Sequence, residues 1–511
     1  MSTVTLPDPD RGVTSRRNDI VKQLRRLVPE ATVIADEEGR RTFECDALTA
    51  YRCLPLAVVL PSSTEEVSAI LRFCHENHVK VVPRGAGTSL AGGALPLEDA
   101  LVVCLSRMSK VLKVDPSNRV ARVEAGTTNI AVTEAASKHG LFYAPDPSSQ
   151  IACTIGGNIA TNSGGAHCLK YGVTVNNLLG VRMVMMDGEV IEFGGVHLDS
   201  PGYDFLPLIT GSEGQLGIVT EATVRLLAAP EGSKPMLIGF DSTEAAASCV
   251  AAIIAAGIVP VAIEFMDRPA IHVCEHFVPA GYPLDAEAVL IVEVEGSEDE
   301  IEYLLEKVED IARDFLPTSL RRSQSAEETA LIWKGRKAAF GAIGQISDYI
   351  CMDGVIPLSK LSKALDEIGW ICRKYRFDVA NIFHAGDGNL HPLILYNAND
   401  SVQLERVELC GGEILKLCIQ LGGCLTGEHG VGIEKRELMY EQFTDEDIDQ
   451  QVRIKEEFDP SWLLNPGKVF PIEGRNAKKT RSIELTDLGA GGDEQVEVAI
   501  EAELVEGHDA P

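Results

Sequence analysis

The chain has 511 residues, of which 45% are hydrophobic and 24% charged, and its formal net charge is −30. This length allows two to four domains, and the composition is that of a globular protein. The acidic balance argues against a nucleic-acid partner, because nucleic-acid binders need clustered Lys and Arg for their phosphate contacts.

The thirteen cysteines form no CxxC pair and show no repeated spacing. This pattern indicates a reducing compartment and argues against an iron–sulfur cluster held by this chain. Residues 1–10 lack the apolar core of a signal peptide, so we expect a cytoplasmic protein. Residues 245–263 contain no charge but include Gly257 and Pro260, which favours a buried helix followed by a strand over a membrane span.

Residues 1–53 form a lead-in with one basic amphipathic helix, expected over 18–28. From residue 54 a strand–helix–strand pattern begins, and Ser63 is placed to cap the helix. Strands are expected over 57–60, 80–83, 101–105, 120–124, 181–186 and 219–226. Residues 54–231 are therefore predicted to form an α+β domain rich in glycine loops.

A linker is expected near 229–235, and a second domain of alternating helices and strands then extends to residue 471. Its helices are predicted near 243–256, 298–315 and 359–375, and its strands near 237–240, 261–266, 288–295 and 379–396. Residues 472–511 form an acidic tail, predicted to be disordered, with nine acidic residues and no Lys or Arg after Arg481.

Three glycine-rich stretches lie in the first domain, at 83–93, 146–165 and 211–219. Glycines let backbone N–H groups approach an anion closely, and Thr88 and Ser89 add hydroxyl donors. The first stretch has Leu90 where a dinucleotide-binding fingerprint needs its third glycine, and the chain has no P-loop motif. Each stretch alone fits an ordinary turn, but three together indicate one long ligand held between backbone loops.

Two histidines, His384 and His391, flank a Gly-Asp-Gly-Asn segment, and Glu428-His429 follows later. If residues 386–389 close a hairpin, the two imidazoles face each other with their Cβ atoms roughly 5 Å apart. Two imidazoles and a carboxylate suit Zn²⁺ and also admit Mn²⁺ or Fe²⁺, with one imidazole to spare. The alternative is a hydrogen-bonded pair of histidines in a structural hairpin.

A family resemblance rests on Arg84–Gly93, Thr154–Asn158, Gly211–Ile218 and Asn465–Lys468, which resemble the flavin-binding pattern of the vanillyl-alcohol-oxidase (PCMH-type) flavoproteins. With His384–His391, Gly427–Gly432 and Cys351-Met-Asp-Gly354, the chain is similar to the FAD-linked D-2-hydroxyacid dehydrogenases over roughly residues 40–470. This resemblance implies a PCMH-type FAD-binding domain over 54–231 and a substrate-cap domain with an antiparallel sheet over 235–471.

The resemblance also implies non-covalent FAD, with its pyrophosphate on the 84–89 loop and its ring near residues 145–146, 157–158 and 218. The implied cofactor-binding residues are Arg84, Gly85, Ala86, Gly87, Thr88, Ser89, Pro145, Asp146, Thr154, Gly156, Gly157, Asn158, Gly164, Gly165, Ile218 and Asn465.

In the second domain the resemblance implies His384, His391 and Glu428 as ligands of a divalent metal, zinc first, with His429 as the general base. Arg336 aligns with an arginine that grips the substrate carboxylate; the alternative is a solvated helix arginine. Phe340 and Cys351 replace a threonine and a lysine of relatives that act on dicarboxylates, which points to a small monocarboxylate.

The implied function is FAD-dependent oxidation of a small 2-hydroxy acid, glycolate to glyoxylate, by hydride transfer. Electrons would pass to FAD-binding and iron–sulfur partner subunits of a glycolate oxidase complex and on to quinone, with peripheral attachment to the inner face of the membrane through those partners. The alternatives are a D-lactate dehydrogenase, a flavin-binding electron-transfer subunit without catalysis, and a zinc hydrolase without flavin.

Overall fold

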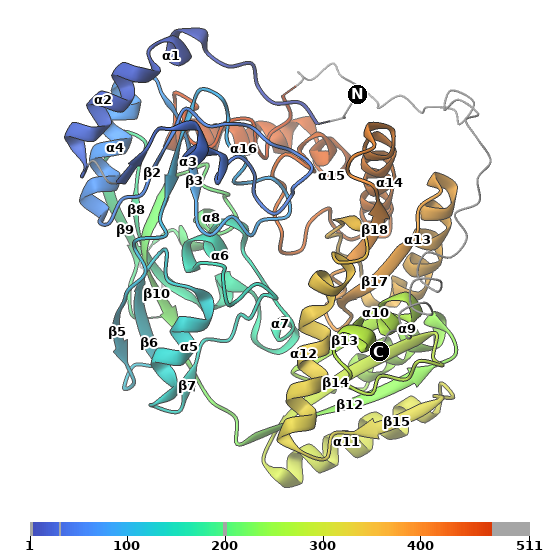
Figure 1. Cartoon of the computed structure of the whole chain (residues 1–511). Helices are drawn as coiled ribbons and strands as arrows, with labels where there is room; N and C mark the ends of the chain where they lie inside the picture. The colour runs from blue at the N-terminus through green and yellow to red at the C-terminus, as the bar shows by residue number, and fades with distance from the viewer. Residues whose placement is uncertain (1–3, 30–31, 198–201, 473–511) are drawn as a thin grey trace, which may run out of the picture. The chain divides into compact units, whose positions relative to one another are not determined.

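The computed structural model describes residues 4–29, 32–197 and 202–472. Residues up to Pro471 form one compact unit, drawn in Figure 1. The acidic tail predicted from residue 472 lies outside the described residues, apart from Ile472. Within the described ranges, no helix is long and apolar enough to cross a membrane.

The first sheet has four strands in the order β1-β2-β4-β3, and its three longer strands run parallel. The helix that links β2 to β3 begins where the sequence predicts, because Ser63 Oγ accepts from the Glu66 amide. The strands are β1 Val33–Ile34, β2 Ala57–Val59, β3 Lys80–Arg84 and β4 Ala100–Cys104, and the helices are α1 Arg11–Ser15, α2 Arg17–Leu27, α3 Glu37–Arg41 and α4 Thr64–Asn77.

The second sheet has five antiparallel strands in the order β5-β6-β10-β8-β9. One hydrophobic core joins it to the first sheet, with Val67 of α4 and Val181 of the second sheet in the same cluster. The strands are β5 Val111–Asp115, β6 Val120–Glu124, β8 Leu178–Val184, β9 Val190–Gly194 and β10 Ile218–Arg225, with a separate pair of β7 Leu141–Phe142 and β11 Leu227–Ala228. Short helices connect them: α5 Asn129–Ser137, α6 Ile155–Thr161, α7 Cys168–Tyr171, η2 Thr174–Asn177 and α8 Leu206–Ile209.

The third sheet has seven antiparallel strands in the order β15-β12-β14-β13-β17-β18-β16. They are β12 Gly232–Phe240, β13 Ala262–Asp267, β14 Ala288–Gly296, β15 Ser319–Arg322, β16 Asp348–Cys351, β17 Val379–His384 and β18 Pro392–Tyr396. Its helices are α9 Thr243–Ala255, α10 Arg268–Phe277, α11 Glu298–Arg313, α12 Ala326–Ile343, η3 Leu358–Lys360, α13 Leu361–Tyr375 and α14 Ser401–Gln420.

Both faces of this sheet are covered by helices, so nearly every residue of the inner strands β13, β14 and β17 is buried. Along β12, Ile238 and Phe240 join the core formed with α9, α11, α13 and α14, whereas Leu237 joins the core formed with α10 and α12. The charge-free run at 245–263 is α9 followed by the start of β13, so the prediction of a buried helix and a strand is confirmed.

The last segment of the compact unit returns to the first sheet through η4 Arg436–Leu438, α15 Met439–Gln442 and α16 Asp445–Phe458. Lys455 donates to the Gln215 carbonyl at 2.6 Å, and the Asn465 amide donates to the Val81 carbonyl at 2.7 Å. The strands of the two predicted domains thus belong to different sheets, but the end of the second domain packs on the first. The exact division at 231–235 stays a prediction.

Candidate active site

A cavity of about 470 Å³ lies where the glycine loops of the first two sheets meet the α12 side of the seven-stranded sheet. Its size is typical of a cofactor or substrate site. Eleven of the sixteen expected cofactor residues line it: Arg84, Gly85, Ala86, Gly87, Thr88, Ser89, Thr154, Gly156, Gly157, Asn158 and Ile218. Lys337, Phe340, Tyr349, His391, Glu428 and His429 line its other end.

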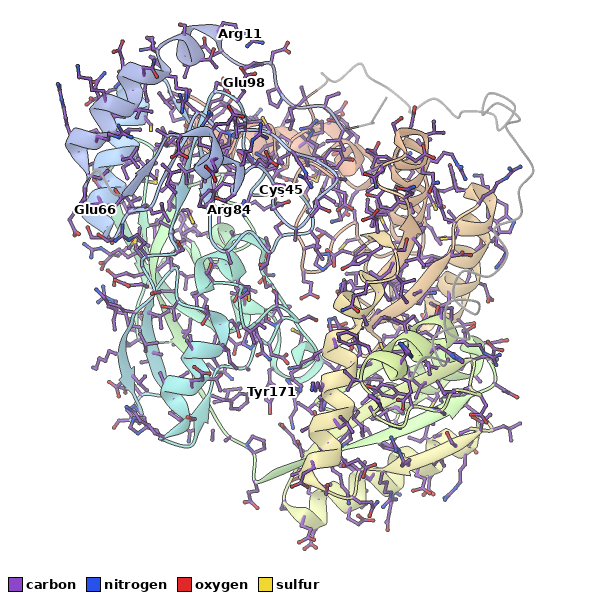
Figure 2. The ribbon with its side chains drawn as sticks, viewed as in Figure 1. Arg11, Cys45, Glu66, Arg84, Glu98 and Tyr171 are labelled. Atoms are coloured by element: carbon purple, nitrogen blue, oxygen red, sulfur yellow. The ribbon has the colours of Figure 1, made fainter. Side chains whose placement is uncertain are left out.

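Two glycines of the first loop, Gly85 and Gly87, lie so close to neighbouring side chains that a Cβ atom would not fit. The backbone of this loop therefore lines the cavity directly. A Cβ at Gly85 would lie 2.3 Å from Thr154 Oγ1, and one at Gly87, where φ is +74°, would meet the Arg84 guanidinium. Arg84 is itself held by a 2.7 Å hydrogen bond to the Cys45 carbonyl (Figure 2). A loop of exposed amides and hydroxyls beside a fixed guanidinium fits the phosphates of FAD.

The five other expected cofactor residues do not line the cavity but contact the segments that surround it. The Gly164 amide donates to Glu428 Oε2 at 2.9 Å, and the Asn465 side chain donates to the carbonyls of Gly93 and Glu213. The Pro145 carbonyl accepts from Asn129, and Gly165 packs too closely on Asp146 to accept a Cβ.

Asp146, expected beside the flavin ring, forms ion pairs with His167 at 3.1 Å and Lys337 at 3.2 Å. The other ring nitrogen of His167 lies 3.4 Å from Glu293 on β14. Burial alone would lower the pKa of His167, but the adjacent Asp146 and Glu293 carboxylates raise it to about 10. His167 is therefore a charged link between the glycine-loop half and the seven-stranded sheet.

The hairpin that carries the two histidines has a different register from the expected one. Asn381 pairs with Pro392 and His384 pairs with Asn389, so residues 385–388 form the turn. His391 lies two residues beyond the partner of His384, on the same face, and the prediction of directly opposed histidines was wrong. The rings still approach to 5.2 Å between centroids, because diagonal neighbours on one sheet face are within reach of long side chains.

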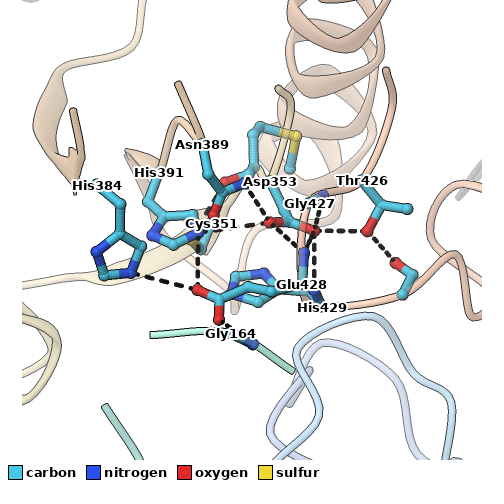
Figure 3. A network of polar contacts seen from close by, with 12 residues as sticks. Gly164, Cys351, Asp353, His384, Asn389, His391, Thr426, Gly427, Glu428 and His429 are labelled. Atoms are coloured by element: carbon cyan, nitrogen blue, oxygen red, sulfur yellow. Dashed lines mark hydrogen bonds and ion pairs between the residues drawn. The ribbon is translucent and has the colours of Figure 1, made fainter. Parts of the chain in front are cut away.

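The three expected metal ligands do converge, as Figure 3 shows. Glu428 Oε1 lies 3.3 Å from His384 Nε2 and 3.5 Å from His391 Nε2. Neither ring nitrogen of the buried His391 makes a hydrogen bond, and its Nε2 lies 3.4 Å from Asp353 Oδ1 as well as near Glu428. Burial alone would raise the pKa of Glu428, but hydrogen bonding to His384 lowers it to about 2. An orphaned imidazole beside an ionised carboxylate fits a divalent cation.

The second nitrogen of His384 is held by a residue that sequence reasoning missed. Glu264 is the cross-strand partner of His384, and its Oε1 lies 2.7 Å from His384 Nδ1. Such a carboxylate contact orients a metal-binding imidazole and selects its tautomer. The sequence signal was slight: Glu264 is the first charged residue after the charge-free stretch 245–263.

Arg336, which is expected to grip a substrate carboxylate, is not among the residues that line the cavity. Its guanidinium is buried and lies 2.5 Å from Glu264 Oε2. The physical reason is charge balance, because a buried guanidinium and a buried carboxylate each require a counter-charge. Burial would raise the pKa of Glu264, but Arg336 and His384 lower it. Lys337, the next residue, lines the cavity instead.

Asp353, also missed, organises the loop that carries Glu428 and His429 (Figure 3). Its carboxylate accepts from the amides of Gly427, Glu428 and His429 at 2.9–3.2 Å, from Thr426 Oγ1 at 2.5 Å and from Asn389 Nδ2 at 2.9 Å. Burial would raise its pKa, but nearby His429, His391 and Lys435 bring it well below its usual range.

A second group, Asp353, His391 and His429, also has metal-ligand spacing in the described residues. Asp353 is the weaker ligand candidate because its oxygens already accept several donors, whereas Glu428 Oε1 faces only imidazoles. The geometry therefore favours His384, His391 and Glu428 as the ligand set.

His429 projects into the cavity and stacks on His391, with centroids 4.8 Å apart and an interplanar angle of 11°. Burial lowers the pKa of His429 to about 4, and its Nδ1 has no partner. The imidazole is thus neutral at pH 7 and can accept a proton.

Comparison with known proteins identifies the family. The model described as FAD binding domain matches residues 55–194, and that described as FAD linked oxidases, C-terminal domain, matches residues 229–469. The glycolate oxidase subunit GlcD of Escherichia coli (strain K12) is 48% identical over 474 residues, covering 93% of this chain and 94% of that protein. The chain belongs to the FAD-linked oxidases.

Other relatives of this FAD-linked oxidase extend the comparison. A D-lactate dehydrogenase of Archaeoglobus fulgidus is 35% identical and covers 86% of this chain and 96% of that protein. The crystal structure of p-cresol methylhydroxylase with substrate bound, at 16% identity, superposes with a TM-score of 0.77 over 91% of this chain and 98% of that chain. The predicted PCMH-type α+β fold is confirmed, and the chain is an FAD-dependent oxidoreductase.

Asp353→Asn is expected to lower the free energy of unfolding by about 1–3 kcal/mol, because the amide would turn N–H donors toward the loop amides. It should also lower the amount of metal retained. Denaturant unfolding and elemental analysis of the purified protein measure both. Asp400→Asn is the matched control, since this half-buried helix cap accepts equally well as Asn. Equal losses in the two variants would contradict the role given to Asp353.

His167→Gln is expected to destabilise the protein most at low pH. A histidine whose pKa is raised from its ordinary 6.5 to about 10 contributes stability that is complete below pH 6.5 and lost as pH rises through 10. The difference in unfolding free energy from the parent should therefore shrink between pH 6 and pH 10. His139→Gln, at an exposed site, is the control. A difference that does not change with pH would refute the ion-pair assignment.

Proposed function

We propose that this FAD-linked oxidase oxidises glycolate to glyoxylate as the flavin-carrying subunit of a glycolate oxidase. One observation carries the proposal: glycine loops suited to FAD line the same cavity as His391, Glu428 and His429, and His384 lies behind them, 3.3 Å from Glu428. A zinc hydrolase would need no such flavin cradle. The similarity to the GlcD subunit supports glycolate as the substrate.

The oxidation removes a hydride from C2 of glycolate and a proton from its hydroxyl group. When bound, FAD supplies the hydride acceptor, and the divalent ion, zinc or alternatively Mn²⁺ or Fe²⁺, supplies a Lewis acid for the hydroxyl. His429 takes the hydroxyl proton, because its neutral imidazole faces the cavity. Asp353 and Glu264 hold the base and His384 in place, so that little reorganisation accompanies the reaction.

A small substrate fits the far end of the cavity. Phe340 and Tyr349 lie edge to face at 6.2 Å, and Phe340 lies at the same distance from His391. These rings present an apolar surface, whereas the second carboxylate of a dicarboxylate substrate would need a cation or a hydrogen-bond donor. Lys337, which also pairs with Asp146 at 3.2 Å, lies on this part of the cavity wall and is the cation that we assign to the one carboxylate of glycolate. Arg336 acts on the site through Glu264 and His384.

The electrons leave through partner subunits. All thirteen cysteines are unpaired, and neither candidate metal group in the described ranges contains one. We therefore assign the onward transfer to FAD-binding and iron–sulfur subunits of the complex, and propose a cytoplasmic location with peripheral attachment to the membrane through them.

The competing substrate is D-lactate, which the D-lactate dehydrogenase relative favours. We expect glycolate to give the higher kcat/KM in assays with an artificial electron acceptor. A higher kcat/KM for D-lactate would identify D-lactate, rather than glycolate, as the substrate.

We expect His429→Ala to lower kcat by about 10²- to 10⁴-fold through loss of the base. Full activity of His429→Ala would favour a subunit without catalysis at this site.

Removal of the metal is expected to abolish turnover even when excess FAD keeps the flavin site filled. The ligands belong to the 384–391 hairpin and the 427–432 loop, whereas the flavin loops lie in the first half of the chain. Dialysis against a chelator, followed by absorption spectroscopy and assay, tests this, and re-addition of Zn²⁺, Mn²⁺ or Fe²⁺ identifies the ion. Undiminished turnover of metal-free protein would rule out the metal.

A further inference from the structure

The 427–432 loop is held at both ends by buried carboxylates from different parts of the chain. Asp353 accepts the amides of residues 427–429, as described above. At the other end, Glu213 accepts the Val431 amide at 2.6 Å and the Gly432 amide at 2.9 Å. Between them, the Gly430 carbonyl accepts from Lys435 Nζ at 3.0 Å. Every amide of the loop except that of Gly430 thus donates to one of two carboxylates.

Glu213 belongs to the third flavin loop, residues 211–219, and hydrogen bonds of its backbone amide and carbonyl fix its position there. Its φ is +51°, a left-handed conformation that a residue other than glycine seldom adopts. Its amide donates to the Ala160 carbonyl at 2.8 Å, and its carbonyl accepts from Asn465 Nδ2 at 2.8 Å. Glu213 also lines the cavity beside Ser212 and Gly214. A ligand that orders this loop therefore also orders Glu213.

A second flavin loop reaches the same group of metal ligands. The Gly164 amide donates to Glu428 Oε2 at 2.9 Å, and the preceding Thr161 and Ser163 line the cavity. A Cβ at Gly164 would lie only 3.0 Å from Glu428 Oε2, so the contact depends on close approach of the backbone. Two of the three flavin loops thus touch the segment that carries the ligand and the base.

We propose that Glu213 is a positioning residue that couples the flavin loops to the 427–432 loop, so that FAD and the divalent metal bind cooperatively. This rests on the proposed function, which places FAD and the metal in the one cavity. Flavin binding orders the 211–219 loop, and the Glu213 carboxylate then holds the 427–432 loop with Glu428 directed at His384 and His391. The metal binds a loop that is already ordered, and its affinity rises. By linkage, the metal strengthens FAD binding by the same factor.

The direct test is calorimetric titration with Zn²⁺ of full-length protein stripped of flavin and metal, with and without saturating FAD. Burial raises the pKa of Glu213 to about 7, so pH 8 keeps its carboxylate ionised. We expect FAD to lower the dissociation constant for Zn²⁺ by about 5- to 150-fold, the usual span of coupling between sites. Equal constants with and without FAD would overturn the proposal.

Glu213→Gln identifies the route of the coupling. Its amide group would oppose one loop N–H, and we expect the effect of FAD on the Zn²⁺ constant to fall below about twofold. The matched control is Glu124→Gln, since Glu124 is also a buried carboxylate that accepts a backbone amide, from Lys110, away from the 427–432 loop. The control should retain the coupling. Coupling retained in Glu213→Gln would overturn the role of Glu213.

These binding measurements are separate from turnover. Failure of glycolate to reduce the flavin would defeat the proposed function and leave the measured coupling in place. Loss of coupling in a protein that oxidises glycolate would defeat only the present inference. If Glu213→Gln does not fold, the wild-type titrations still decide whether the two ligands are coupled.

Discussion

The site depends on one buried interaction, the capture of three consecutive backbone amides by the carboxylate of Asp353. The side chains of adjacent residues in an extended segment point in different directions. With its backbone fixed by Asp353, the loop directs Glu428 toward the two histidines and His429 into the cavity. A buried carboxylate without donors is costly, so the interaction strongly disfavours other conformations of the loop.

The rest of the fold places the other groups of the candidate site around that loop. The seven-stranded sheet supplies His384 and its partner Glu264 from adjacent strands, and it buries both faces under helices, which leaves little freedom of movement. The glycine-loop half supplies the flavin cradle and contacts the opposite side of the same loop through Gly164 and Glu213. The candidate site is therefore shared between parts of the chain far apart in sequence, and charged pairs such as His167 with Asp146 and Glu293 connect them.

Much of this could be predicted from the sequence, because periodicity and capping are local properties. Residues 120–124 form a strand as predicted, Ser63 caps its helix, and His384, His391 and Glu428 come together. The hairpin register could not be predicted, since it depends on which of two adjacent turns closes, a difference of one residue. Arg336 shows a second limit: a motif gives the residue type, but only packing reveals that Glu264 occupies its guanidinium. Asp353 belongs to the Cys351–Gly354 motif, but its role depends on hydrogen bonds to a loop more than seventy residues away in the sequence.

In the proposed reaction a hydroxy acid in this cavity loses hydride to the flavin while the loop held by Asp353 presents the base. Anaerobic rapid mixing of the FAD- and metal-loaded protein with glycolate, and with glycolate deuterated at C2, tests it in a single turnover. We expect the absorption of oxidised flavin to be bleached and deuterium to slow the bleaching several-fold. Flavin that stays oxidised in the presence of saturating glycolate would contradict it.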